Sequence, residues 1–171
     1  MILIDTNVIS ELWKPAPDAQ VQAWLDAQAI ETLYLSAVTV AELRFGLMSM
    51  PAGKRRAVYL DRLQQEVLAA FAGRVLAFDL HAALAYADLM ARARAAGKAI
   101  GMTDGYIAGT AAAHGFMVAT RDTSPFEAAG LSVVNPWQAA QNPSPTDAPQ
   151  PGVPRGSGGP VGGSVGGSVA V

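Results

Sequence analysis

The chain has 171 residues, with 12 Lys and Arg against 14 Asp and Glu, so its formal net charge is −2. A protein that binds duplex DNA by neutralising many phosphates is usually basic, so bulk charge does not indicate that class of protein. The absence of cysteine excludes disulfides, thiolate metal sites and cysteine nucleophiles. The N-terminal apolar run is too short for a signal-peptide core, and no stretch reaches membrane-spanning length, so we expect a soluble, cytoplasmic protein.

The composition changes abruptly after Trp137. From Gln138 onward the chain is mostly Pro, Gly, Ser, Val and Ala, and its only charged residues are Asp147 and Arg155. Such a segment cannot bury enough apolar surface to offset the entropy of ordering it, so we predict a disordered tail over residues 138–171. The remaining residues, 1–137, are predicted to form one domain that is long enough for a hydrophobic core.

Short apolar runs alternate with helical patterns along this domain. The predicted strands lie at 2–4, 33–35, 75–78, 116–119 and 131–134. The predicted helices lie at about 7–14, 18–29, 37–50, 54–71, 80–97 and 103–114. Continuous apolar strands separated by helices are typical of a parallel sheet that is covered on both faces. The predicted fold class is therefore α/β.

Four acidic residues lie in apolar segments near one expected edge of this sheet. Asp5 directly follows the first predicted strand, and Asp122 comes three residues after the fourth. Asp104 lies in the first turn of a predicted helix, and Glu42 lies on the helix that follows the second strand. Ligands of open parallel sheets bind beyond the carboxyl ends of the strands, so all four acids can converge on a single site.

Clustered, buried carboxylates indicate a metal site, because each charge loses water and repels the others. Ligands of oxygen alone, without His or Cys, favour hard cations such as Mg²⁺. We predict that Asp5, Asp104 and Asp122 bind the ion directly or through water, and that Glu42 binds it through water or positions the nucleophile. The residues expected to orient these ligands or the attacking water are Thr6, Asn7 and Thr120.

Each of these residues also has a simpler structural explanation. Asp5 and Asn7 could cap the helix that follows them, and Asp104 could cap its own helix. Asp122 could be an ordinary loop acid, and Glu42 an exposed acid on a helix. Only the joint occurrence of the acids at the expected ligand edge favours a metal site over these explanations.

Several segments of the chain resemble the PIN domain nucleases, and among them the VapC and FitB toxins of bacterial type II toxin–antitoxin pairs. The resemblance lies in residues 3–12, 36–46, 104–111, 118–123 and 134–137, which together span the domain. Each motif alone is weakly specific, but the four acidic motifs in this order are strongly specific. The Thr-Arg-Asp-Thr and Asn-Pro-Trp sequences resemble the FitB branch in particular.

The resemblance implies a three-layer fold with a five-stranded parallel sheet, and a Mg²⁺ or Mn²⁺ site built from Asp5, Glu42, Asp104 and Asp122. It also implies endoribonuclease activity and a homodimer that is silenced by a cognate antitoxin, whose other end commonly binds promoter DNA. The tail after Trp137 is not part of the family pattern.

Two alternatives remain open at this point. A phosphatase or phosphotransferase with an Asp nucleophile also places an aspartate after its first strand, but it normally has a second acid two residues later, where this chain has Asn7. A PIN-like binding module that has lost catalysis is the other alternative, and the presence of all four acids argues against it.

Overall fold

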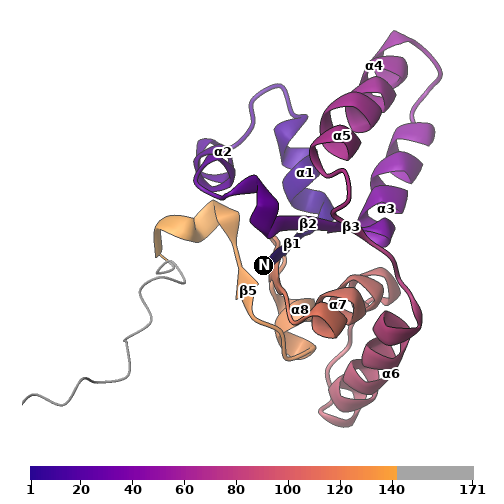
Figure 1. Cartoon of the computed structure of the whole chain (residues 1–171), viewed down its shortest axis with the longest axis vertical. Coiled ribbons are helices and arrows are strands. Elements are labelled where there is room, and N and C mark those ends of the chain that lie inside the picture. The colour runs from indigo at the N-terminus through magenta and orange to yellow at the C-terminus, as the bar shows by residue number, and fades with distance from the viewer. Residues whose placement is uncertain (142–171) are drawn as a thin grey trace, which may run out of the picture.

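A computed structural model describes residues 1–141 of the chain, with side chains as far as Gln138. At its centre are five strands (Figure 1), namely β1 (Ile2–Ile4), β2 (Leu33–Ser36), β3 (Val75–Leu76), β4 (Met117–Ala119) and β5 (Val133–Val134). They pair in the order β3-β2-β1-β4-β5, and every pair is parallel. The predicted α/β class and five-stranded parallel sheet are confirmed.

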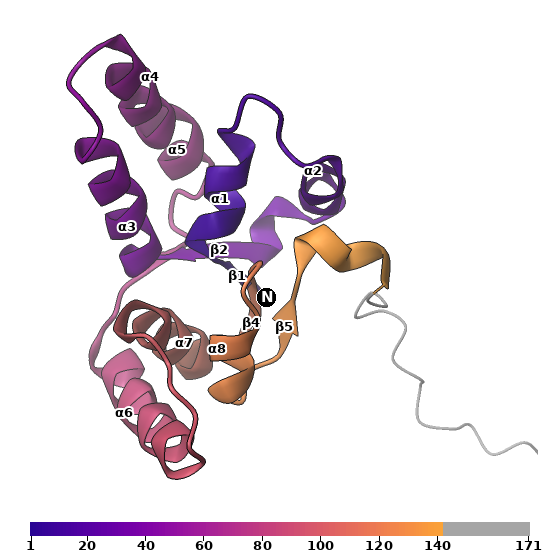
Figure 2. The same cartoon turned by 180° about the vertical axis from the view of Figure 1, so that it is seen from behind.

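Helices cover both faces of the sheet, as the opposite views in Figures 1 and 2 show. One face carries α1 (Thr6–Leu12), α2 (Ala19–Asp26), α3 (Ala37–Met48), α4 (Lys54–Arg62), the π-helical segment η2 (Leu63–Val67) and α5 (Leu68–Ala70). The other face carries α6 (Leu80–Ala95), α7 (Met102–His114) and α8 (Ser124–Ala128). Short 3₁₀ helices lie at η1 (Ile30–Thr32) and η3 (Pro136–Gln141).

The central strand β1 has apolar residues at every position because both of its faces are covered. Ile2 and Ile4 pack into one hydrophobic cluster with residues of α1, α2 and α3. Leu3, on the opposite face, packs into a second cluster with Leu89 of α6 and Ile107 of α7. Because β1 packs between two hydrophobic clusters, the position of the residue that follows it, Asp5, is fixed by the core.

The last described element, η3, spans the position of the domain boundary predicted at Trp137. Helix η3 runs to Gln141 and packs against α2. The backbone N–H of Trp137 donates to Oδ1 of Asn135 at 3.0 Å, which starts this helix directly after β5. The disorder predicted for residues 138–171 stays a prediction, and residues 142–171 of that segment lie outside the described part of the chain. No helix within residues 1–141 is long and apolar enough to cross a membrane.

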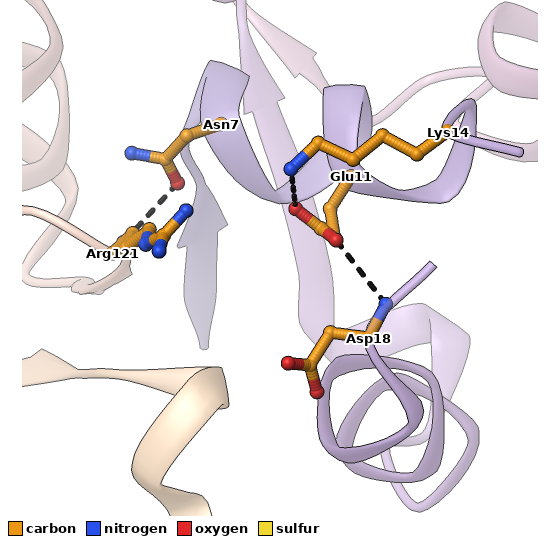
Figure 3. Close-up of polar contacts among 5 residues, drawn as sticks. All are labelled: Asn7, Glu11, Lys14, Asp18 and Arg121. Atoms are coloured by element: carbon orange, nitrogen blue, oxygen red, sulfur yellow. Dashed lines mark hydrogen bonds and ion pairs between the residues drawn. The ribbon is translucent and has the colours of Figure 1, made fainter. Parts of the chain in front are cut away.

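A buried carboxylate ties the end of α1 to the start of α2 (Figure 3). Glu11 is only 5% exposed, and its carboxylate accepts from Nζ of Lys14 at 2.6 Å and from the backbone N–H of Asp18 at 3.1 Å. The hydrogen bond from Lys14 is the main reason why the pKa of Glu11 lies below its ordinary value of 4.5. The ionised form of Glu11 therefore stabilises the fold.

We expect Glu11→Gln to lower the melting temperature by roughly 2–5 °C at pH 7, because a charge-assisted contact is lost. The pKa of Glu11 is lowered in the folded state. Its contribution to the free energy of unfolding is therefore complete above pH 4.5 and disappears as the pH falls through the folded-state pKa. Thermal unfolding of both proteins from pH 7 down to pH 3, approximately, measures this difference. A melting-temperature difference that stays constant over this range would contradict the role given to the charge.

Candidate active site at the carboxyl edge of the sheet

Asp5 occupies the first position after β1 and is 6% exposed. Its backbone N–H donates to the carbonyl oxygen of Ala119 at 3.0 Å, so the residue still follows the pairing of β1 with β4. Its Oδ1 accepts from the backbone N–H of Thr6 at 2.7 Å, and Asp5 is thus the N-cap of α1. The capping explanation of Asp5 is correct, but it uses only one of the two carboxylate oxygens.

The second oxygen of Asp5 is held by two side chains from different segments. Oδ2 accepts from Nδ2 of Asn7 and from Oγ1 of Thr120, both at 2.7 Å. The Thr120 hydroxyl also accepts from Nδ2 of Asn7 at 2.9 Å and from the backbone N–H of Asp122 at 3.2 Å. Asn7 and Thr120 therefore fix the orientation of Asp5 and join the segments that follow β1 and β4.

Glu42 reaches the same edge of the sheet from α3. Its Oε2 accepts from Oγ1 of Thr6 at 2.6 Å, a contact between residues 36 positions apart in the sequence. Thr6 thus uses its backbone to hold Asp5 and its side chain to hold Glu42. The other carboxylate oxygen of Glu42 has no protein donor among residues 1–141 in this structure.

Asp104 is the third residue of α7, which begins one residue earlier than predicted. The residue that flanks the helix start is Gly101, so the expectation that Asp104 could cap its helix is wrong. The carboxylate bends back over Gly101, since a Cβ atom built there would lie 3.0 Å from Oδ2 of Asp104. Gly101 therefore leaves room for the acid, a role that its sequence position alone did not reveal.

The carboxylates influence one another across the site. The pKa of Asp5 is raised above 3.8, mainly by burial, while hydrogen bonds from Thr120 and Thr6 oppose this shift, and Glu42 and Asp104 add repulsion. The pKa of Asp104 is also raised, first by burial and then by the charges of Glu42 and Asp122. The charge of Asp5 thus interacts with those of Glu42 and Asp104, and the charge of Asp104 interacts with those of Glu42 and Asp122.

The donor set of this site suits a hard divalent cation. The ion pairs found within residues 1–141 are Lys14–Glu11 and Arg62–Glu66, so no basic side chain there neutralises the four acids. No three acidic or His side chains in that range are close enough together to hold an ion by themselves. This spacing is compatible with Mg²⁺, which usually keeps several waters and binds one or two carboxylates directly.

Comparisons with known proteins show which family the chain resembles. Residues 2–131 match a family model described as PIN domain. The chain is 71% identical over 140 residues to VapC ribonuclease Y4jK of Sinorhizobium fredii. The aligned residues make up 82% of this chain and 100% of that protein. It is also 52% identical over 137 residues to Toxin FitB of Neisseria gonorrhoeae. The aligned residues make up 80% of this chain and 99% of that protein.

Solved structures show the same similarity. The crystal structure of FitAcB from Neisseria gonorrhoeae matches with a TM-score of 0.78 and 52% identity, over 80% of this chain and 99% of that chain. The structure of FitAB bound to the IR36 DNA fragment matches with a TM-score of 0.78 and 50% identity, over 80% of this chain and 96% of that chain.

Proposed function

We propose that this chain, which belongs to the PIN domain family, is a metal-dependent endoribonuclease and the toxin of a type II toxin–antitoxin pair. The observation that carries the proposal is the set of four carboxylates at the carboxyl edge of the sheet, which repel one another and have no basic partner within residues 1–141. The names of the similar proteins support the same activity, because one is a VapC ribonuclease and another is a toxin.

The residues proposed to hold Mg²⁺, or Mn²⁺ in its place, are Asp5, Asp104 and Asp122, directly or through water. When bound, such an ion lowers the pKa of a coordinated water and offsets negative charge on the phosphate that is attacked. Asp5 is prepared for this role because its donors, Thr6, Asn7 and Thr120, fix both carboxylate oxygens. Domain residues 1–137 are proposed to form the nuclease, with 138–171 as an appended tail.

Glu42 is proposed to position the attacking water. Thr6 holds Oε2 of Glu42 and leaves the second oxygen able to accept a hydrogen bond from water. The water oxygen would form the new bond to phosphorus while the phosphodiester P–O bond breaks, and the water proton would pass to an acceptor such as Glu42. Asn7 offers no acid for phosphotransfer through an aspartate nucleophile, since its side-chain amide is engaged with Asp5 and Thr120.

The partners are proposed from the similar structures. One is described as FitAB bound to a DNA fragment, and we propose that this chain likewise binds a cognate, DNA-binding antitoxin. We further propose that it forms a homodimer and meets its RNA substrate in the cytoplasm. An antitoxin that brings an Arg or Lys to the four carboxylates would block the site with charge-assisted hydrogen bonds.

The purified full-length chain should cut single-stranded RNA when Mg²⁺ or Mn²⁺ is present and should leave it intact in EDTA. Expressing the chain alone should slow bacterial growth, and co-expressing the small neighbouring gene should restore it. Cleavage at an equal rate in EDTA would contradict the metal-dependent mechanism. Normal growth together with no binding to a neighbouring gene product would remove the toxin role but leave the nuclease role intact.

A further inference from the structure

Arg121 lies in the segment after β4, between Thr120 and Asp122 of the acidic site. Its backbone N–H donates to Oδ1 of Asn7 at 3.2 Å, and Figure 3 shows the Asn7 side chain facing the Arg121 main chain. Its carbonyl oxygen accepts from Nδ2 of Asn135 at 3.4 Å. Both main-chain groups of Arg121 are therefore tied down, one of them by a residue that also orients Asp5.

The guanidinium group of Arg121 rests on an aromatic surface. Its central carbon lies 5.4 Å from the centre of the Trp137 ring. Trp137 belongs to η3, which packs against α2, and the ring is partly buried at the border of the first hydrophobic cluster. An arginine that stacks through its flat face keeps the N–H groups around its edge available for other partners.

Arg121 is exposed and forms no ion pair with any residue of 1–141, although four carboxylates lie at the same edge of the sheet. The basic residues that form ion pairs within residues 1–141 are Lys14 and Arg62. A cationic side chain on the segment that also carries Thr120 and Asp122, without an ion pair within residues 1–141, is available to an anion. The anion that must reach this site is a phosphate, and four carboxylates would otherwise repel it.

We propose that Arg121, held on Trp137, binds a backbone phosphate of the RNA strand next to the bond that is cut. The inference rests on the proposed nuclease function and adds the residue that receives the substrate. A guanidinium edge binds phosphate oxygens through two parallel N–H groups, whereas lysine offers a single point charge. Arg121 therefore contributes mainly to substrate binding, and the carboxylates contribute to the chemical step.

The test uses the full-length chain, a single-stranded RNA oligonucleotide and Mn²⁺, with kcat and KM measured from about 50 to 200 mM salt. For Arg121→Met we expect KM to rise roughly tenfold and kcat to stay within about twofold of the unchanged protein. The slope of log kcat/KM against log salt should become less steep by about 0.7, the value for one lost contact to a single strand. Arg121→Lys should restore the slope but only part of the increase in KM.

Arg92→Met is the matched control, because Arg92 is an exposed arginine of α6 that lines a hollow with Met1 and Met117 at the amino ends of the strands. It should leave KM and the salt slope unchanged. The inference is overturned if the unchanged protein cuts RNA and Arg121→Met shows the same KM and slope. It is also overturned if Arg121→Met lowers the melting temperature and kcat while KM and the salt slope stay unchanged. In that case the contact of Arg121 with Trp137 would serve the structure and not the binding of RNA. If the unchanged protein cuts no RNA with either metal, the proposed function itself fails.

Discussion

Asp104→Asn is expected to lower RNA cleavage at least about a hundredfold, because changes to residues that only support metal ligands already cost 10–100-fold. The same substitution should raise the melting temperature of the metal-free protein, by less than about 3 °C, since solvent screens part of the repulsion at this half-buried position. Loss of activity without loss of stability would separate a functional role for Asp104 from a structural one.

Two effects on the stability of α7 oppose each other at Asp104. A negative charge in the first helical turn is favourable because of the helix dipole. Burial and the charges of Glu42 and Asp122 are unfavourable, and they prevail, since the pKa of Asp104 is raised. At a pH below about 3.8, Asp104 is protonated in both the folded and the unfolded state, so ionisation costs no stability. At a pH above the folded-state pKa, the full cost of ionising Asp104 is present. The advantage of the Asn variant should appear at neutral pH and disappear in acid.

Thermal unfolding in EDTA across this pH range, together with cleavage assays, measures both effects. The matched control is Asp61→Asn, which makes the same change at an exposed acid of α4 that has no ion pair within residues 1–141. It should leave cleavage and the pH profile unchanged. An Asp104 variant that cuts RNA as fast as the unchanged protein would remove Asp104 from the proposed site.

Gly109→Ala is expected to destabilise the fold by about 1–3 kcal/mol, the usual cost of adding a methyl group to a packed interface. A Cβ at Gly109 would lie 2.7 Å from Cβ of Tyr86 and 2.8 Å from the carbonyl oxygen of Ala82 on α6. The backbone of α6 cannot rotate away from the new methyl group as a long side chain could. Because α7 also carries Asp104, a shift of this helix should reduce cleavage as well.

Gly46→Ala provides the control for helix propensity, since a Cβ built at Gly46 in α3 has no atom within 4 Å apart from the neighbouring residues and the nearby backbone of its own helix. There the substitution should stabilise the protein by roughly 0.5–1 kcal/mol, because glycine in a helix loses more backbone entropy than alanine. Chemical denaturation should therefore show changes of opposite sign in the free energy of unfolding for the two variants. Equal effects at Gly46 and Gly109 would contradict the close packing of α6 against α7.

The sheet could be predicted from the sequence because its strands are buried and almost continuously apolar. The edge strands β3 and β5 are shorter than the predicted ranges 75–78 and 131–134, since each has a neighbour on one side only and pairs over two residues. Helix α8 was not predicted, because five residues are too few to show a helical period. Its signals were Pro125 in the first turn and the buried Phe126.

The placement of the candidate acids near one edge of the sheet could be predicted because Asp5 and Asp122 follow strands and Asp104 lies in the first turn of a helix. Their supporting contacts could not be predicted in the same way. The hydrogen bond from Thr6 to Glu42 joins residues 36 positions apart, and the one from Arg121 to Asn7 joins residues 114 positions apart. Such contacts depend on how helices and loops pack around the finished sheet, which no local sequence pattern specifies.

The most direct test of the proposed metal-dependent nuclease is a Mg²⁺ titration in which melting temperature and initial rate of RNA cleavage are followed on the same preparations. Binding to the folded state raises the melting temperature, so both quantities should rise over the same range of Mg²⁺ concentration in the unchanged protein. In Asp104→Asn both responses should be absent or shifted to much higher Mg²⁺ concentration. Cleavage that persists in EDTA, or a Mg²⁺ response that is equal in the two proteins, would contradict the assignment of these carboxylates as the catalytic metal site.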